Sequence, residues 1–146
     1  MKVFTIGFTH TNAENFFGRL KSNCIERLLD VRLLNTSQLA GFAKRNDLPY
    51  FLRELVGADY EHAPLLAPTQ EMLDAYKKEG SVSWEEFEGG FLALMRERRI
   101  ETGLNREDFE RRTVLLCSEE TADHCHRRLV AEYLAERWRG LEIVHL

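Results

Sequence analysis

The stretch TVLLCSEETADHCHRRLVAEYLAERW at residues 113–138 contains the clearest strand of the chain and a helix that follows it. Thr113–Cys117 is β-branched and apolar throughout, which predicts a buried strand. Thr121 or Asp123 is suited to cap the helix, which we expect to run to about Trp138. The inner stripe of this helix holds Cys125, Leu129, Tyr133, Leu134 and Trp138. A strand that leads through a polar turn into an amphipathic helix is typical of α/β proteins.

The N-terminal segment shows the same alternation of strand and helix. Val3–Ile6 predicts a strand that ends at Gly7, and Asn12 can cap a helix that ends near Cys24. We expect Cys24 to pack against the core. Ile25–Arg32 then predicts a second strand, buried in its middle and charged at its end. A strand, a helix and a strand in this order favour parallel pairing.

The rest of the chain predicts three further helices, two short strands and connectors. The expected helices are residues 49–56, opened by Pro49 and closed by Gly57, a segment from Thr69 to Gly80, and a longer one capped by Ser83 with Glu86 in the capping-box position. The expected strands are Asp59–His62 and Leu141–His145. We expect a loop at 33–47, and a highly charged, solvated helix end followed by a connector at 96–112. The pattern predicts a single α/β domain over residues 1–146, with three layers, a mostly parallel sheet and helices on both faces.

Length and composition are those of a globular protein. The chain has 146 residues, 44% of them hydrophobic and 30% charged, and its net charge of -4 gives no overall attraction to nucleic acid or membranes. Its 3 cysteines cannot close a disulfide framework among themselves. The sequence shows no signal segment and no apolar run of about 18 residues. We therefore expect reduced thiols, a cytoplasmic location and no membrane partner.

Polar side chains follow the ends of three predicted strands. The first strand is followed by Gly7, Thr9 and His10, the second by Asp30 and Arg32, and the strand at 113–117 by Cys117, Glu119, Cys125, His126 and Arg127. Ligands of open parallel sheets bind outside the carboxyl ends of the strands. We therefore expect these residues to form one site, although the sequence does not show that they are neighbours.

The start of the last helix suggests what that site does. Unpaired N–H groups and the helix dipole favour negative charge there, and two interpretations follow. Cys125 could be a thiolate of lowered pKa, helped by His126 or Arg127. Equally, the N–H groups and Arg127 could hold a phosphate or carboxylate of a ligand. The assigned catalytic residues are Cys125, His126, Cys117 and Glu119. The assigned ligand-binding residues are Gly7, Thr9, His10, Asp30, Arg32 and Arg127.

Structural interpretations of the same residues stay open. Cys117 and Cys125 can be small buried hydrophobes, and Asp30 with Arg32 can be an internal salt bridge. Zinc bound by Cys117, Cys125 and His126 is an alternative, but the spacing is unlike a Cys-x-x-Cys knuckle, so no metal is assigned. A disulfide between the two cysteines is another alternative. No nucleotide-binding glycine motif, P-loop, His-Glu-x-x-His or Gly-x-Ser-x-Gly is present, so the cofactor is unknown.

Five segments resemble a bacterial and archaeal family called domain of unknown function 488. They are TIGFTH at 5–10, LLDVR at 28–32, LLCSEE at 115–120, CHRRLVAEYL at 125–134 and IVHL at 143–146. The resemblance implies a compact α/β domain of no settled activity. The recurring polar residues of the family would fall on Gly7, Asp30, Arg32, Cys117, Glu119, Cys125, His126 and Arg127.

The chain departs from the family pattern in two places. Family members often have His-Ser after TIG, whereas this chain has Phe8-Thr9 and then His10. The family loop after DVR is richer in arginine and proline than the LLNTS found here at 33–37.

Three hypotheses of function follow from the sequence. The first is a site at the carboxyl edge of the sheet for an anionic, nucleotide-like or phosphorylated ligand, with catalysis by the Cys-His-Arg cluster left open. The second is a nucleic-acid-binding module, supported by Lys44, Arg45 and the arginines of 96–112. The third is a non-catalytic structural or partner-binding domain. The oligomeric state is not indicated.

Overall fold

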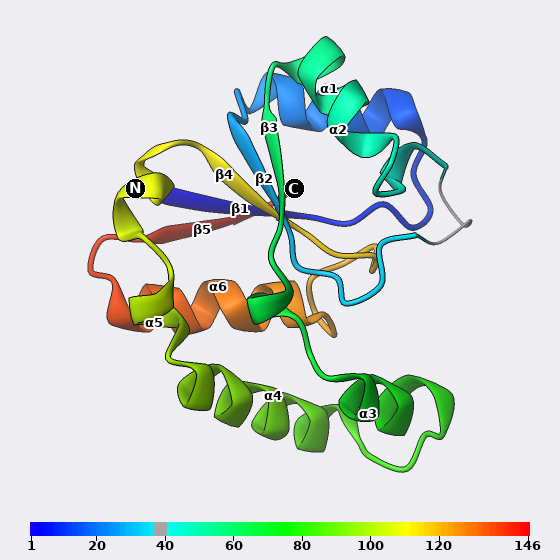
Figure 1. Cartoon of the computed structure of the whole chain (residues 1–146), viewed down its shortest axis with the longest axis vertical. Helices are drawn as coiled ribbons and strands as arrows, with labels where there is room; N and C mark the ends of the chain where they lie inside the picture. The colour runs from blue at the N-terminus through cyan, green and yellow to red at the C-terminus, as the bar shows by residue number, and fades with distance from the viewer. Residues whose placement is uncertain (37–40) are drawn as a thin grey trace.

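Five parallel strands form one sheet in the order β3-β2-β4-β1-β5 (Figure 1). The computed structural model describes residues 1–36 and 41–146. The strands are β1 (Lys2–Ile6), β2 (Arg27–Asp30), β3 (Asp59–His62), β4 (Thr113–Leu116) and β5 (Glu142–His145). The predicted parallel sheet is confirmed, and β4 lies between β1 and β2. The carboxyl ends of these three strands are therefore adjacent, as the site hypothesis requires.

Helices cover both faces of the sheet, as predicted (Figure 1). On one face lie α1 (Ala13–Ser22) and α2 (Leu48–Phe51), which continues as the π-helical segment η2 (Leu52–Val56). The other face is covered by α4 (Trp84–Arg98), α5 (Ile100–Gly103) and α6 (His126–Arg137). Short helical segments complete the order: η1 (Gly41–Ala43), η3 (Pro64–Leu66), α3 (Gln70–Leu73), η4 (Asp74–Lys78) and η5 (Arg106–Glu110).

Two hydrophobic cores lie on opposite sides of the sheet because neighbouring strand residues point in opposite directions. In β4, Leu115 packs with α4 and α6, whereas Val114 and Leu116 pack with α1 and α2. All four residues of β4 are fully buried. A strand that is apolar on both sides is typical of a parallel sheet between two helical layers.

Several predicted caps are confirmed. The side chains of Asn12, Thr69 and Ser83 each accept a hydrogen bond from a backbone N–H in the first turn of their helices. Gly57 ends η2 in the left-handed conformation at φ 78°. In the part of the chain that the structure describes, no helix is both long and apolar enough to span a membrane. Residues 37–40 of the expected loop lie outside the described residues.

The segment 96–112 is more ordered than its charge predicted. It contains the end of α4, all of α5 and η5, because Ile100 and Phe109 are buried on the sheet side. Arg98 donates hydrogen bonds to the carbonyls of Leu65 and Ala67, at 2.8 and 2.7 Å. The helix end at the start of this segment was predicted, whereas the short helical segments α5 and η5 in the connector were not.

The predicted position of Cys24 is also wrong. The helix α1 ends at Ser22, and Cys24 is exposed with a positive φ of 52°. An exposed thiol does not contribute to the core.

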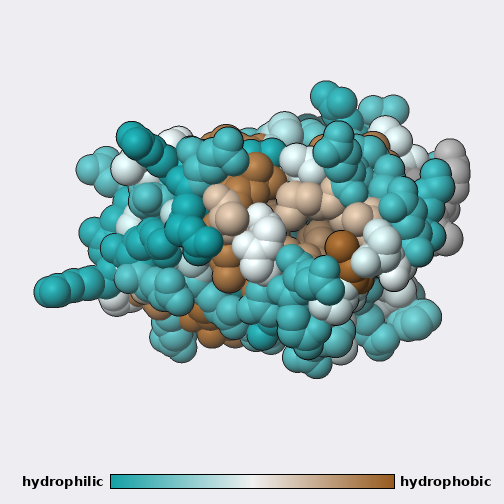
Figure 2. Space-filling view, turned by 90° about the horizontal axis from the view of Figure 1, so that it is seen from below, coloured by the Kyte–Doolittle hydropathy of each residue, from teal (hydrophilic) through white to brown (hydrophobic). Residues whose placement is uncertain are grey.

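The outer face of α3 and α4 has an apolar hollow ringed by hydrophilic side chains (Figure 2). Between these helices lies a groove lined by Met72, Ala75, Val82, Phe87 and Gly90, with Glu71 and Glu86 at its sides. The groove neighbours the cavity described below, because Phe87 lines both.

The helix α6 begins later than predicted. Its N-cap is Cys125, in extended conformation at φ -135°, and not Thr121 or Asp123. Residues 117–124 form an irregular loop instead. Arg127 holds this loop in place, because it donates hydrogen bonds to the carbonyls of Glu119 and Glu120 at 2.6 and 3.5 Å. These hydrogen bonds hold Glu119 and Glu120 in the loop that precedes the helix.

Gly7 is where the end of β1 meets this loop. A Cβ atom at position 7 would overlap the carbonyl oxygen of Glu119 and lie 2.9 Å from a guanidinium nitrogen of Arg127. Thr9 continues the contact, since its N–H and its hydroxyl both donate to the carbonyl of Ser118, at 3.1 and 2.6 Å. Glycine is therefore required at position 7 for packing against the loop.

We expect Gly7→Ala to destabilise the protein by about 3 kcal/mol, because the backbone of the loop must shift to admit a methyl group. Gly18→Ala in α1 is the matched control, since a Cβ at Gly18 meets nothing within 4 Å. Alanine in an exposed helix should be neutral or stabilising by up to about 1 kcal/mol. Denaturant unfolding measures both variants. Equal stability of the two would contradict the packing role of Gly7.

Candidate functional site

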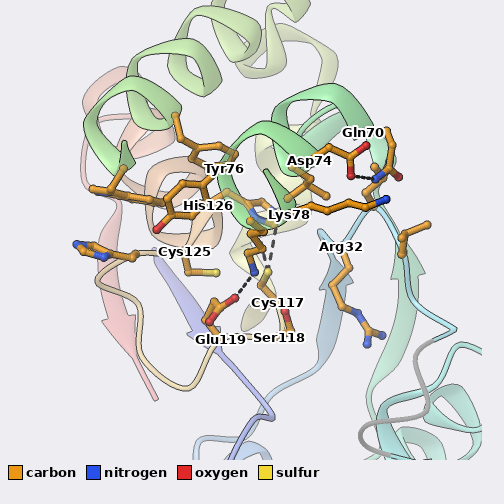
Figure 3. A pocket seen from close by; sticks show the side chains of 17 residues that line it. Arg32, Gln70, Asp74, Tyr76, Lys78, Cys117, Ser118, Glu119, Cys125 and His126 are labelled. Atoms are coloured by element: carbon orange, nitrogen blue, oxygen red, sulfur yellow. Dashed lines mark hydrogen bonds and ion pairs between the residues drawn. The ribbon is translucent and has the colours of Figure 1, made fainter. Parts of the chain in front are cut away.

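A cavity of about 260 Å³ lies at the carboxyl edge of the sheet (Figure 3). Its floor is formed by the residues that follow β4 and by the start of α6, and α3, η4 and α4 form its walls. One wall is aromatic, with Tyr76, Trp84 and Phe87 in contact. The charged residues of its lining are Arg32, Asp74, Lys77, Lys78 and Glu119. Its size is near the lower end of small-molecule sites, which span about 300–1,000 Å³.

Cys117, Cys125 and His126 lie together at the floor of the cavity. The two sulfurs and one ring nitrogen are all within 4.8 Å of one another, and all three residues are buried. In Figure 3 the sulfurs of Cys117 and Cys125 face the same space. The sequence-based expectation that these residues meet is confirmed. Both sulfurs also line the cavity, so they are not sealed from it.

The imidazole of His126 is held in one orientation. Its Nε2 lies 2.7 Å from the carbonyl oxygen of Val31, which can only accept, so Nε2 carries a proton. The Nδ1 atom lies 3.6 Å from the sulfur of Cys117. Burial lowers the pKa of His126, which favours the neutral ring. The same sulfur lies 3.9 Å from Nε2, so it is nearly equidistant from the two ring nitrogens and does not lie along the lone pair of Nδ1, the nitrogen that is free to accept a proton.

The two thiols differ in acidity. A hydrogen bond from Cys125 lowers the pKa of Cys117 to about 7 against the effect of burial, and the Ser118 N–H and the charges of Arg127 and Lys77 assist. Burial and the same hydrogen bond raise the pKa of Cys125 well above its ordinary value. These directions favour Cys117 over Cys125 as the more acidic thiol, whereas the sequence suggested a lowered pKa at Cys125.

Lys77 and Glu119 form an ion pair at the mouth of the cavity. Burial lowers the pKa of Lys77, but the hydrogen bond to Glu119 and the nearby sulfurs outweigh it, and the pKa is raised. Lys77 is therefore a cation beside both cysteines. Glu119, which was assigned as catalytic, positions Lys77 in this structure.

Arg127 is a buried cation with no acidic partner among the described residues. Its residue is only 1% exposed, its hydrogen bonds go to backbone carbonyls, and its Nε has no partner. Its charge lowers the pKa of Cys117. Arg127 therefore acts on the site through its field and through the loop that it holds, and not as a side chain lining the cavity.

Asp30 and Arg32 form the internal salt bridge that the sequence left open. Arg32 donates to both carboxylate oxygens of Asp30 at 2.8 Å and to the carbonyl of Ala43 at 2.7 Å. Tyr60 donates its hydroxyl to the same carboxylate at 2.7 Å. Burial and the carboxylate raise the pKa of Tyr60, so its hydroxyl stays protonated. The guanidinium of Arg32 points away from the cavity in Figure 3 and is not placed to hold a ligand there.

Thr9 and His10 lie outside the main cavity. Together with Gly7, Arg19 and Glu120 they line a separate polar hollow. His10 is exposed, has a positive φ of 57° and pairs with Glu120 at 2.9 Å. The structure thus divides the predicted site into a thiol cavity, a salt bridge and a second hollow, all at one edge of the sheet.

A family model, described as domain of unknown function DUF488, matches residues 12–134. The chain belongs to the DUF488 family. The matched range includes LLDVR, LLCSEE and CHRRLVAEYL, whereas TIGFTH and IVHL lie outside it. No curated protein and no solved structure matches the chain.

The thiol cluster of this DUF488 protein is also a set that could hold a metal ion. Two sulfurs and an imidazole nitrogen are ligands that zinc uses, and a ring N–H donated to a backbone carbonyl commonly orients such a histidine. A fourth ligand would have to come from the cavity. The sequence assigned no metal, and that prediction remains to be tested.

Sequence reasoning missed Lys77 and Tyr60. Lys77 lies in a helical segment 40 positions before Cys117, and no local pattern distinguishes it from its neighbour Lys78. Tyr60 lies in β3, and its partner Asp30 lies in β2. The sequence offered one signal for this contact: Tyr60 lies in a short predicted strand that can pair beside the strand ending at Asp30.

The salt bridge at Asp30 should be structural. Asp30→Asn removes the charge that compensates the buried Arg32, so we expect a loss of about 3 kcal/mol in the free energy of unfolding. Asp59→Asn removes the carboxylate of an exposed pair with Arg111, and should cost at most about 1 kcal/mol. Thermal or denaturant unfolding compares them, and an Asp30→Asn protein as stable as Asp59→Asn would refute the assignment.

The acidity of Cys117 gives a second expectation. Alkylation by neutral iodoacetamide requires the thiolate, so its rate at Cys117 should rise with pH, with a midpoint near the pKa of about 7, and then level off. Cys125→Ala removes the hydrogen bond, so the midpoint should move up and the rate at pH 7 should fall about tenfold. Peptide mass spectrometry resolves Cys117 from the exposed Cys24. An unchanged midpoint in Cys125→Ala would contradict the shared hydrogen bond.

Proposed function

We propose that the cavity binds a small anionic molecule, most simply a phosphorylated metabolite, and that Cys117 attacks it as a nucleophile with His126 as acid and base. One observation carries the proposal. The Sγ of Cys117 lies 3.6 Å from Nδ1 and 3.9 Å from Nε2 of an imidazole whose Nε2–H is fixed by the carbonyl of Val31, at the floor of a cavity. A nucleophile, a base and a group that orients the base are the parts that covalent catalysis needs.

The chemistry of the proposed step follows from these contacts. The proton of Cys117 passes to Nδ1 of His126, and the sulfur forms a bond to an electrophilic carbon or phosphorus of the ligand. The leaving group departs with its electron pair and takes the proton back from His126. The carbonyl of Val31 stabilises the imidazolium that exists between these two transfers.

The preference for an anion is supported by the cations around the sulfur. Lys77 and Lys78 line the cavity, and the buried Arg127 carries a charge that no described carboxylate pairs with. Asp74 and Glu119 oppose them, and Glu119 is already paired with Lys77. The volume of about 260 Å³ favours a small phosphorylated molecule over a complete nucleotide.

The nucleic-acid hypothesis loses much of its support. Arg98, Arg106 and Arg112 of the basic segment donate to backbone carbonyls, and Arg111 pairs with Asp59. These arginines hold the fold together. A purely structural role for the thiol cluster remains the alternative that the following experiment separates.

We expect iodoacetate, an anionic alkylating agent, to react with Cys117 faster than neutral iodoacetamide does, once each rate is divided by the rate at Cys24. Lys77→Gln should lower this ratio about fivefold, since a charge a few ångströms away contributes about 1 kcal/mol. Lys2→Gln is the control, because Lys2 pairs with Glu142 on the opposite edge of the sheet. Inorganic phosphate should slow the reaction at Cys117 alone.

The measurements are made on chelator-treated protein with metal content recorded, so that a bound ion does not block the sulfur. If Cys117 reacts no faster than a buried, ordinary thiol, its role as a nucleophile is contradicted. If Cys117 is reactive but shows no preference for iodoacetate, the proposal of an anionic ligand is contradicted.

A further inference from the structure

We propose that Cys117 and Cys125 act as a pair that reduces a small hydroperoxide, with Cys117 as the attacking thiol and Cys125 as the thiol that closes the disulfide. The inference rests on the proposed function, because it uses the same cavity and the same nucleophile. It adds a substrate class and assigns a role to Cys125, which the nucleophilic step above does not use.

Cys125 stands where a helix normally has a capping side chain. Serine, threonine, aspartate and asparagine are preferred at the N-cap because their oxygens accept from the first turn. The side chain of Cys125 makes no such hydrogen bond. Its sulfur lies within 4.8 Å of the sulfur of Cys117, and both residues line the same cavity. The geometry therefore directs this thiol to its neighbour and not to the helix.

The first step oxidises Cys117. Its thiol proton passes to Nδ1 of His126, and the sulfur attacks the outer oxygen of the peroxide ROOH. An S–O bond forms and the O–O bond breaks, so that the sulfur loses two electrons and becomes a sulfenic acid. The alkoxide RO⁻ leaves and takes the proton from His126 as ROH. Lys77 lies beside the sulfurs, where it stabilises the departing negative charge.

The second step consumes the thiol of Cys125. Its sulfur attacks the sulfenic sulfur of Cys117, an S–S bond forms, and the S–O bond breaks. The departing hydroxide takes the proton of Cys125 as water. The sum is two thiols and ROOH giving one disulfide, ROH and water, so atoms and electrons balance. The sulfurs start within 4.8 Å of each other, and the irregular loop 117–124 between them is the segment that adjusts.

Burial selects the oxidant. Cys117 is 4% exposed and Cys125 is 2% exposed at the floor of a small cavity. A disulfide substrate would have to place two sulfur atoms, each with its substituent, in line with the sulfur of Cys117. A peroxide places two oxygen atoms there, which are smaller. A small hydroperoxide, with hydrogen peroxide as the simplest probe, is therefore the class that fits.

The test treats reduced, metal-free protein with one equivalent of hydrogen peroxide. In the wild type, peptide mass spectrometry should find Cys117 joined to Cys125, with the loss of two hydrogen atoms from the mass and with Cys24 still reduced. Cys117 should be consumed at least about tenfold faster than Cys24, because the thiolate is the reactive form. Cys24→Ser, which changes an exposed thiol, should behave as the wild type does.

Two variants separate the steps. Cys125→Ser should stop at the sulfenic acid of Cys117, which a dione reagent traps, whereas Cys117→Ser should leave Cys125 reduced. The wild-type disulfide map alone keeps the test decisive if a variant does not fold. A Cys117 that reacts rapidly with iodoacetate but forms no disulfide with Cys125 overturns this inference and leaves the proposed function standing. A Cys117 inert to both reagents overturns both.

Discussion

The hydrogen bond from Nε2 of His126 to the carbonyl of Val31 is the constraint on which the site depends. It joins the first residue of α6 to the residue after β2, across the end of β4. A carbonyl can only accept, so the bond fixes which nitrogen of the imidazole carries the proton. The other nitrogen, Nδ1, is left free to accept a proton and lies 3.6 Å from the sulfur of Cys117. The chemistry of the cavity is thus set by the order of the strands, because only a central β4 brings both partners to the same thiol.

Cys117 and Cys125 are both buried cysteines, yet the hydrogen bond between them shifts their pKa values in opposite directions. Cys117 receives the bond and the field of Arg127 and Lys77, so its anion is stabilised. Cys125 donates the bond and is equally buried, so its anion is disfavoured. In the function that we propose, this asymmetry gives each thiol one task, since the more acidic sulfur attacks and the other keeps its proton until the disulfide closes.

Periodicity was sufficient for most of the fold. The central strand β4 is buried and apolar on both sides, and the caps are short polar residues such as Asn12 and Ser83, so local rules identify them. The site was only partly predictable, because the rule of the carboxyl edge brings Cys117, Cys125 and His126 together but says nothing of direction. Whether Arg32 faces a ligand or Asp30 depends on contacts with β3 and η1, which are remote in sequence. The start of α6 was predicted too early. The hydrogen bonds of Arg127 to the loop outweigh the local preference for a capping aspartate.

The buried guanidinium of Arg127 explains why negative charge belongs in this site. Removing a cation from water is costly unless a nearby anion compensates it, and no described carboxylate forms an ion pair with Arg127. The carbonyls of Glu119 and Glu120 supply partial negative charge, and the charge of Arg127 in turn lowers the pKa of Cys117, which favours a thiolate there. A neutral Cys117 would leave the guanidinium without that partner. The arginine therefore favours the anionic form of the nucleophile while it holds the loop that shapes the cavity, and the same residue serves packing and reactivity.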